Sequence, residues 1–288
     1  MYIAQAFKYT HEAWKYVVGI IVAFVATQLG SIPLGIVLAL NVLKNKDDIN
    51  ALDNPMQLLA QLDSNLALFL MLLSFAVGLV ILLIWVKAVH KQTITSLTTA
   101  RKKIDWQRVL FSFGLVATII IVLTVLDYVY APENYELQFN WTSFLILAII
   151  AIVMIPLQTS FEEYLFRGYL MQWLGFLTKN RWAPLLITSV IFGGLHYFNP
   201  EVDKLGPIIM LYYIGTGLFL GVITLMDDGL ELALGFHAGN NLVAAVLVTA
   251  DWTVFQTASI LKDVSDPTAG ADVLLPLFIM YPILLLIM

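Results

Sequence analysis

The stretch that decides the fold class is residues 65–86, NLALFLMLLSFAVGLVILLIWV, which contains no charged side chain. A run of about 20 apolar residues is long enough to cross the hydrocarbon core of a bilayer as one helix. The whole chain has the same character: 60% of its 288 residues are hydrophobic, 12% are charged, and the mean hydropathy is +0.86. A soluble domain is about 25% charged. The sequence therefore predicts an integral membrane protein.

Further apolar runs are separated by short polar stretches, with no clear internal repeat and no linker between them. The predicted spans are 16–43, 65–86, 109–126, 142–160, 183–198, 207–226, 232–249 and 273–288. The first run is too long for a cleavable signal and should remain as an anchor. We predict an all-α, polytopic transmembrane helical bundle of about eight spans, which forms a single membrane domain over residues 1–288.

The distribution of basic residues predicts the orientation. The loop 87–108 is rich in Lys and Arg, whereas the loop 127–141 is acidic and has none. The positive-inside rule places the first loop in the cytoplasm. Alternation from there puts every Lys and Arg, Arg167 included, on the cytoplasmic side except Lys44, Lys46, Lys204 and Lys262. We expect a multi-pass protein of the bacterial plasma membrane with both termini in the cytoplasm. The lipid bilayer is an expected partner, and nucleic acid is not, because no basic stripe is present.

Three segments place polar side chains inside or beside the predicted spans. They are SFEEYLFR at 160–167, FGGLH at 192–196 and GFHAGNN at 235–241. A charged side chain at membrane depth costs at least about 2.5–3.5 kcal/mol, so such residues persist where they pair or line a hydrated cavity. The segments therefore predict one shared polar site. Its candidate residues are Glu162, Glu163, Arg167, His196, His237 and Asn241.

Helical spacing suggests how the two glutamates and the arginine are arranged. Glu163 and Arg167 are four residues apart, so they share one helix face and suit an ion pair. Glu162 points about 100° away from Glu163, which allows the two carboxylates to have different partners. A structural ion pair near the cytoplasmic interface is the alternative for Glu163 and Arg167.

The other candidates come from two further spans. His237 and Asn241 are also four residues apart, and both could face one cavity. His196 is expected deep in the fifth span, where Gly193 and Gly194 would allow a neighbouring helix to approach closely. A buried structural histidine and helix–helix hydrogen bonding are the alternatives for these residues.

The chemistry open to this set is narrow. The chain has no cysteine, no G-x-S-G serine context, no G-x-G-D aspartyl motif and no H-E-x-x-H zinc motif. A buried glutamate beside a histidine can act as general base on a water, and His or Asn can donate hydrogen bonds to an oxyanion. Zn²⁺ commonly takes three protein ligands plus water at a catalytic site. Glu162, His196 and His237 could supply them, and the residues leave both mechanisms open.

The three segments resemble, in order and spacing, the motifs E-E-x-x-x-R, F-x-x-x-H and H-x-x-x-N. These belong to the CAAX protease and bacteriocin-processing (CPBP, or Abi) family of intramembrane proteases. The matching residues here are EEYLFR at 162–167, FGGLH at 192–196 and HAGNN at 237–241. A eukaryotic relative of the family trims prenylated CAAX proteins. The resemblance implies a helical bundle with a conical cavity, a catalytic core over 140–250 and additional N-terminal spans over 1–130.

The resemblance also implies roles. Glu162 would activate water and His196 would hold it, while His237 and Asn241 would stabilise the oxyanion. Glu163 and Arg167 would shape the site, and the family leaves a divalent metal such as zinc open. The expected function is that of an intramembrane endopeptidase acting on a membrane-associated or lipidated peptide or protein.

Two alternatives belong to other functional classes. A secondary transporter would predict two repeated halves with matching broken helices, and no repeat is visible. A non-catalytic scaffold of the same fold would be expected to have lost motif residues, whereas all six are present.

Overall fold

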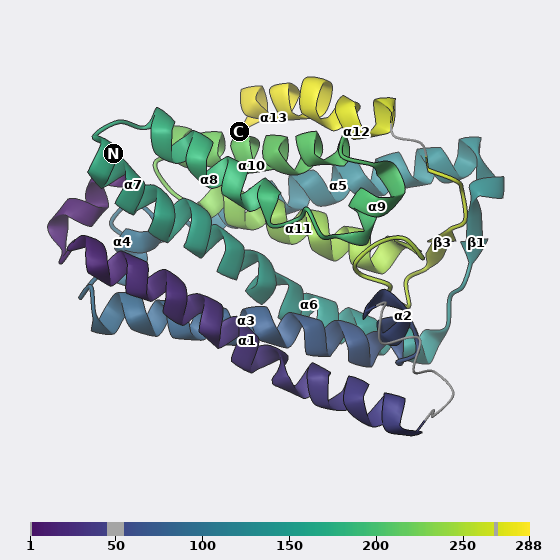
Figure 1. Ribbon diagram of the computed structural model, residues 1–288. Coiled ribbons are helices and arrows are strands. Elements are labelled where there is room, and N and C mark those ends of the chain that lie inside the picture. The colour runs from purple at the N-terminus through teal and green to yellow at the C-terminus, as the bar shows by residue number, and fades with distance from the viewer. Residues whose placement is uncertain (1, 45–54, 268–269) are drawn as a thin grey trace.

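The computed structural model describes residues 2–44, 55–267 and 270–288, and most of them are helical. The long helices lie side by side with roughly parallel axes (Figure 1). They are α1 (Ala13–Lys44), α3 (Ser64–Ala88), α5 (Trp106–Tyr130), α6 (Trp141–Glu163) and α10 (Ile209–Met226). This arrangement confirms the predicted all-α polytopic membrane bundle.

Shorter elements complete the chain. The remaining helices are η1 (Ile3–Lys8), α2 (Pro55–Ala60), α4 (Ile94–Thr98), η3 (Pro132–Asn134), η4 (Tyr164–Leu170), α7 (Met171–Thr178), α8 (Trp182–Gly194), α9 (Pro200–Leu205), α11 (Glu231–Leu247), α12 (Ala271–Leu275), η5 (Pro276–Met280) and α13 (Tyr281–Ile287). Three short strands, β1 (Tyr135–Leu137), β2 (Val248–Ala250) and β3 (Leu261–Asp263), form a sheet of order β1-β3-β2. β3 pairs antiparallel with β1 and parallel with β2 at one end of the bundle (Figure 1).

Each predicted span coincides with a helix, but the helices differ in length. Within the described residues, five helices are long and apolar enough to cross a membrane, and α6 continues into α7 as one of them. The spans predicted at 183–198 and 232–249 are shorter helices of 13 and 17 residues, α8 and α11. The last predicted span is also a short apolar helix, Val273–Ile287.

The fourth predicted span does not end near residue 160. The helix continues from Trp141 to Thr178 over 38 residues, and its middle part, η4, is π-helical. The predicted end of this span at residue 160 was therefore wrong, and Arg167 lies inside the helix and is fully buried. The sequence pattern did not reveal that the helix continues, because two of the groups that contact Arg167, the carbonyl of Gly217 and the ring of Phe192, come from distant parts of the chain.

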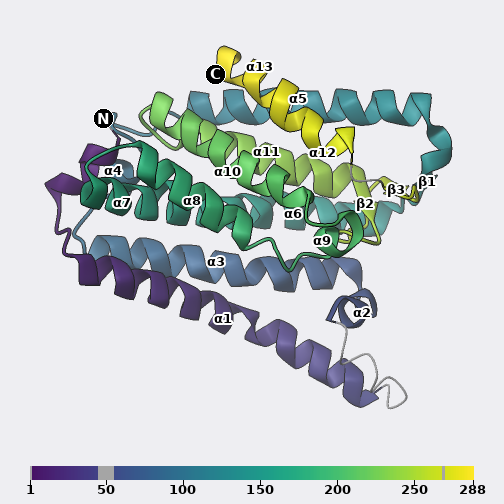
Figure 2. The same cartoon turned by 45° about the horizontal axis from the view of Figure 1, so that its top comes forward.

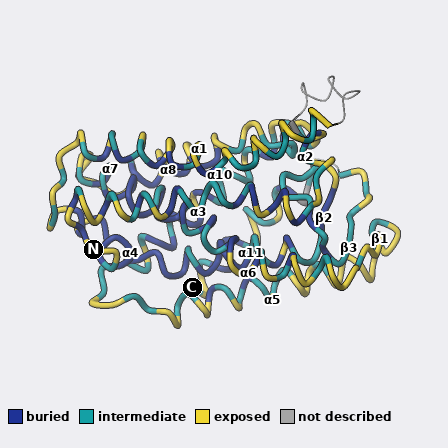
Figure 3. Tube along the Cα trace, turned by 90° about the horizontal axis from the view of Figure 1, so that it is seen from below, coloured by how far each residue is buried: buried dark blue, intermediate teal, exposed yellow. Residues whose placement is uncertain are grey.

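Packing makes α6 and α11 the central helices. α1 packs on α3, α3 on α6, α6 on α11, and α11 on α5, while α8 packs on α10. Figure 2 shows α6 between α3 and α11. Exposed residues follow the outer faces of α1 and α5, whereas much of α11 is buried (Figure 3). The site segments on α6 and α11 are thus held at the middle of the bundle, and apolar side chains on α1 and α5 are available to lipid.

Two glycines decide which face of α11 points towards α6. A Cβ on Gly235 would overlap the carbonyl oxygen of Val109, and one on Gly239 would lie 2.9 Å from the carbonyl oxygen of Phe113. Small residues four apart let helix backbones approach closely in a membrane, and here α5 occupies that face. His237 lies about 200° around the helix from Gly235. It therefore points away from α5, towards α6.

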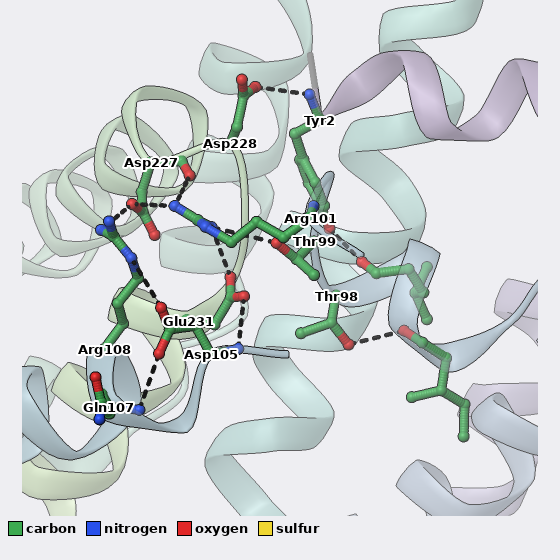
Figure 4. A network of polar contacts seen from close by, with 12 residues as sticks. Tyr2, Thr98, Thr99, Arg101, Asp105, Gln107, Arg108, Asp227, Asp228 and Glu231 are labelled. Carbon is green, nitrogen blue, oxygen red and sulfur yellow. Dashed lines mark hydrogen bonds and ion pairs between the residues drawn. The ribbon is translucent and has the colours of Figure 1, made fainter. Parts of the chain in front are cut away.

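A network of charged residues fixes the start of α11 to the segment before α5 (Figure 4). Arg101 donates from Nη2 to Oδ1 of Asp227 at 2.7 Å and lies 3.4 Å from Oε2 of Glu231. Arg108 donates to the same oxygen of Asp227 at 2.5 Å. The backbone amide of Asp105 donates to Oε1 of Glu231 at 3.2 Å. We call these five residues the terminal network.

Candidate active site

The ion pair predicted between Glu163 and Arg167 is confirmed. Nη1 of Arg167 donates to Oε1 of Glu163 at 2.9 Å, and both side chains are 0% exposed. Nη2 of Arg167 donates to the carbonyl oxygen of Gly217 at 3.1 Å, which links the pair to α10. The guanidinium carbon lies 4.2 Å from the centre of the Phe192 ring, a distance suited to a cation–π contact.

His237 lies between the two glutamates. Its Nδ1 is 2.8 Å from Oε1 of Glu163, and its Nε2 is 3.5 Å from Oε2 of Glu162. Glu162 and Glu163 therefore meet one imidazole on its two different nitrogens, instead of having separate partners. Oε1 of Glu163 also accepts from Arg167, so it is the acceptor for the Nδ1–H of His237. Nε2 is left facing Glu162. We call Glu162, Glu163, Arg167 and His237 the central cluster.

Asn241 lies one turn further along α11 and contacts α6 through a residue that sequence reasoning missed. Its Nδ2 donates to Oε1 of Gln158 at 3.2 Å, and its Oδ1 accepts from Nδ2 of Asn240 at 3.0 Å. Gln158 is 4% exposed and precedes Glu162 by four residues, so the two share one face of α6. That spacing, in an otherwise apolar span, is the signal that could have found it.

His196 was expected deep in the fifth span, but it lies in a half-buried turn after α8. α8 ends at Gly194, where adjacent glycines disfavour the helix. Nδ1 of His196 lies 2.8 Å from the carbonyl oxygen of Phe192, and its ring stacks on Tyr213 with centroids 4.5 Å apart. Among the contacts of the described residues, His196 makes no hydrogen bond or ion pair with Glu162.

Phe192 connects His196 to the central cluster. Its ring centroid is 4.9 Å from that of His196 and 6.1 Å from that of His237, and it also lies beneath the guanidinium of Arg167. The close packing expected at Gly193 is confirmed, because a Cβ there would lie 2.8 Å from the backbone nitrogen of Ile214. Phe192 is thereby held in contact with both His196 and the central cluster.

The proposed metal ligands do not form a three-ligand set. Within residues 2–44, 55–267 and 270–288, no group of three or more His, Cys, Asp or Glu side chains is placed to hold a metal ion. Glu162 and Nε2 of His237 are close, but among the described residues His196 makes no hydrogen bond or ion pair with either of them. The donor set does not fit a zinc site in this geometry, and no step proposed below passes through a metal.

Comparisons with known proteins show what the part of the chain that carries the site is similar to. Residues 139–243 match the model of a family described as type II CAAX prenyl endopeptidase, Rce1-like. The uncharacterized protein YyaK of Bacillus subtilis (strain 168) is 33% identical over 171 residues, which cover 59% of this chain and 57% of that protein. The chain thus spans less than two thirds of that relative's length. No solved structure matches. Residues 139–243, which contain all six predicted site residues and Gln158, are thus similar to the Rce1-like, type II CAAX prenyl endopeptidase family.

Proposed function

We propose that this protein is an intramembrane endopeptidase in which Glu162 activates a water that cleaves an amide bond. One observation supports this most directly. Glu162 faces Nε2 of His237 at 3.5 Å, while the other ring nitrogen is bound by Glu163. Glu162 is 12% exposed and Glu163 is 0% exposed. Glu162 is therefore the carboxylate of the pair that a water and a substrate can reach.

The proposed reaction needs no covalent intermediate. Glu162 removes a proton from water, and the water oxygen bonds to the carbonyl carbon of the scissile amide. The carbonyl oxygen then carries the negative charge. When the carbon–nitrogen bond breaks, the proton held by Glu162 passes to the leaving nitrogen, so that the products are a carboxylic acid and an amine, and the acid then gives its proton to the amine or to water.

Two side chains are assigned to the remaining tasks. Asn241 keeps one Nδ2–H beyond its bond to Gln158 and donates it to the oxyanion, a contribution that is commonly worth about 10²- to 10³-fold in kcat. His196, which packs against Phe192, is assigned to hold the attacking water or the substrate. Glu163, held by Arg167, orients His237, and neither residue touches the substrate in the proposed mechanism.

We propose a membrane-associated or lipidated peptide or protein as the substrate, because the domain family carries a CAAX prenyl endopeptidase description. Most Lys and Arg residues lie near the end of the bundle that holds α4 and α7, opposite the β-sheet (Figure 1). By the positive-inside rule that end faces the cytoplasm, and the site is then reached from the bilayer or the cytoplasm. We assign the protein to a bacterial plasma membrane.

The test uses the full chain in liposomes with two quenched fluorescent peptides of one sequence, one carrying a prenylated cysteine and one an acylated N-terminus. We expect wild-type protein to cleave at least one of them, and Glu162→Gln to lower kcat by about 10²- to 10⁴-fold. Glu133→Gln, at an exposed position outside the matched domain, serves as the matched control with wild-type rates. Equal cleavage by wild type and Glu162→Gln contradicts the proposal, and a chelator arm reports metal dependence.

Peptidomics of membranes from cells with wild-type or Glu162→Gln protein then identifies the natural substrate. Peptides that accumulate in the variant and lose a defined terminal segment in the wild type report both the sequence cleaved and the lipid attached to it.

A further inference from the structure

α6 and α11 face each other through two successive pairs of polar side chains. In the first pair, Glu162 Oε2 lies 3.5 Å from His237 Nε2. In the second, Gln158 Oε1 accepts from Asn241 Nδ2 at 3.2 Å. The pairs are one helical turn apart on each helix, because 158 and 162 are four residues apart, as are 237 and 241. The amide pair therefore lies directly beside the pair assigned to water activation.

The contacts of Asn241 determine which end of its amide is available. An asparagine amide has two N–H donors and one carbonyl acceptor. Oδ1 of Asn241 accepts from Asn240, and one Nδ2–H is donated to Gln158. One N–H is left over. With Gln158 in its observed orientation, a 180° rotation of the Asn241 amide would make its oxygen face the oxygen of Gln158, and two acceptors would meet without a proton.

We propose that Gln158 is a positioning residue that holds Asn241 with an N–H, not an oxygen, directed at the reacting carbonyl. The inference rests on the proposed function, since the oxyanion exists only if an amide is hydrolysed. Burial strengthens the effect of Gln158, because it is 4% exposed and water cannot readily replace its carbonyl as the acceptor. Gln158 acts through Asn241 and does not touch the substrate.

A purely structural role for Gln158 predicts something different. Hydrogen bonds between membrane helices contribute about 0.6 kcal/mol on average, so their loss would lower stability slightly and leave turnover of the folded protein unchanged. A positioning role predicts a fall in kcat at unchanged KM, and an effect that disappears when Asn241 is absent.

The test measures kcat and KM of full-length variants in liposomes, with whichever of the two reporter peptides the wild type cleaves in a Glu162-dependent manner. Gln158→Met removes the acceptor at similar volume and is expected to lower kcat about 10- to 100-fold, with KM within about twofold. Gln158→Glu keeps an acceptor oxygen and should restore most of the rate. In the Asn241→Ala background, Gln158→Met should cause no further loss.

Two further variants keep the result decisive. Thr159→Val removes a neighbouring buried hydroxyl that bonds only within α6 and should leave kcat unchanged. Asn240→Ala, at a half-buried position, removes the donor that bonds to Oδ1 of Asn241. It should lower kcat about two- to tenfold even if Gln158→Met fails to accumulate.

Wild-type kcat in Gln158→Met, or in Asn240→Ala if Gln158→Met does not fold, overturns the inference while leaving the proposed function intact. So does a loss in Gln158→Met that adds fully to that of Asn241→Ala. If the wild type cleaves neither reporter in a Glu162-dependent manner, the proposed function fails and the inference fails with it.

Discussion

Two polar clusters meet on α11, and they use their charges differently. The terminal network lies at its first turn, and the central cluster lies further along, around His237. Both combine buried carboxylates with arginines. In the terminal network both oxygens of Glu231 have partners, since Oε2 contacts Arg101 and Oε1 accepts from the backbone of Asp105. The unpartnered atom there is Oδ2 of Asp227.

The central cluster keeps more unused bonding capacity. Oε2 of Glu163 and Nε of Arg167 are buried without a hydrogen-bond partner among the described residues. Among the described residues, the one ion-pair contact of Glu162 is that with His237, at 3.5 Å, longer than a good hydrogen bond. The difference teaches that burial of charge alone does not mark a reactive site. A carboxylate that is held close to its partners but not fully bonded can still take a proton from water.

The largest expected effect comes from making the same substitution in each cluster, at Glu162 in the central cluster and at Glu231 in the terminal network. Glu162→Gln should lower kcat about 10²- to 10⁴-fold while leaving the unfolding transition in detergent nearly unchanged. Glu231→Gln should cost about 1–3 kcal/mol of stability, because a buried charged partner of Arg101 is lost, and should leave cleavage per folded molecule within a few-fold of wild type. The reverse pattern would show that the two clusters have been assigned the wrong way round.

The two arginines provide the second comparison. Arg167→Met leaves Glu163 as an uncompensated buried charge and should lower the free energy of unfolding by about 3–5 kcal/mol. The side chain of Arg101 is 29% exposed, so water compensates part of its loss, and Arg101→Met should cost about 1.5–3 kcal/mol. Chemical unfolding in mixed micelles measures both. A larger loss for Arg101 than for Arg167 would contradict the structure.

Gly235 and Gly239 sharpen the comparison, because they let α11, which carries residues of both clusters, pack closely against α5. Gly235→Ala should destabilise the protein by about 1–3 kcal/mol, since the added methyl must displace the Val109 carbonyl. It should also reduce cleavage by shifting His237. Gly114→Ala on α5 is the matched control, because a Cβ there meets open space. It should be neutral or stabilising by up to about 1 kcal/mol.

The smallest expected effect concerns Glu201, a carboxylate outside both clusters. Burial raises the pKa of Glu201, and its Oε1 accepts from the backbone of Val254. The unfolded chain then loses this proton first, at about pH 4.3. The contribution of Glu201 to stability is full below that pH and is lost as the pH rises through the raised pKa of the folded state.

Unfolding midpoints of wild type and Glu201→Gln, measured from about pH 4 upward, check this. The wild type should lose stability relative to the variant as the pH rises. A wild type that gains stability relative to Glu201→Gln over the same range would contradict the direction of the pKa shift.

Local spacing predicted part of the site. The Glu163–Arg167 pair follows from two residues on one helix, and the apolar runs located every helix that carries the site. What the sequence pattern could not supply are the contacts between helices. The continuation of α6 through Arg167 depends on the carbonyl of Gly217 and the ring of Phe192. The meeting of both glutamates on His237 depends on the glycines that direct α11 towards α6.

The position of His196 shows a different limit. A hydropathy pattern continues through Leu195 to Phe198, so the fifth span was expected to extend past His196. Two adjacent glycines ended α8 earlier, and the side chain came to lie in a turn against Tyr213. The resemblance to the family was visible nonetheless, and a family model matches residues 139–243, because the motif residues and their order do not depend on where the helix stops.

Because of the long helix from Trp141 to Thr178, the depth of the site in the membrane depends on the thickness of the bilayer. Its 38 residues rise about 57 Å, nearly twice the hydrocarbon thickness of about 30 Å. The uncharged part, 141–161, alone rises about 31 Å, so Glu162 follows Trp141 by one membrane thickness along the helix axis. Hydrophobic matching then sets how far Glu162 lies below the lipid surface. A thicker bilayer covers it and a thinner one brings it towards water, so lipid chain length tunes the hydration of the carboxylate to which we assign water activation.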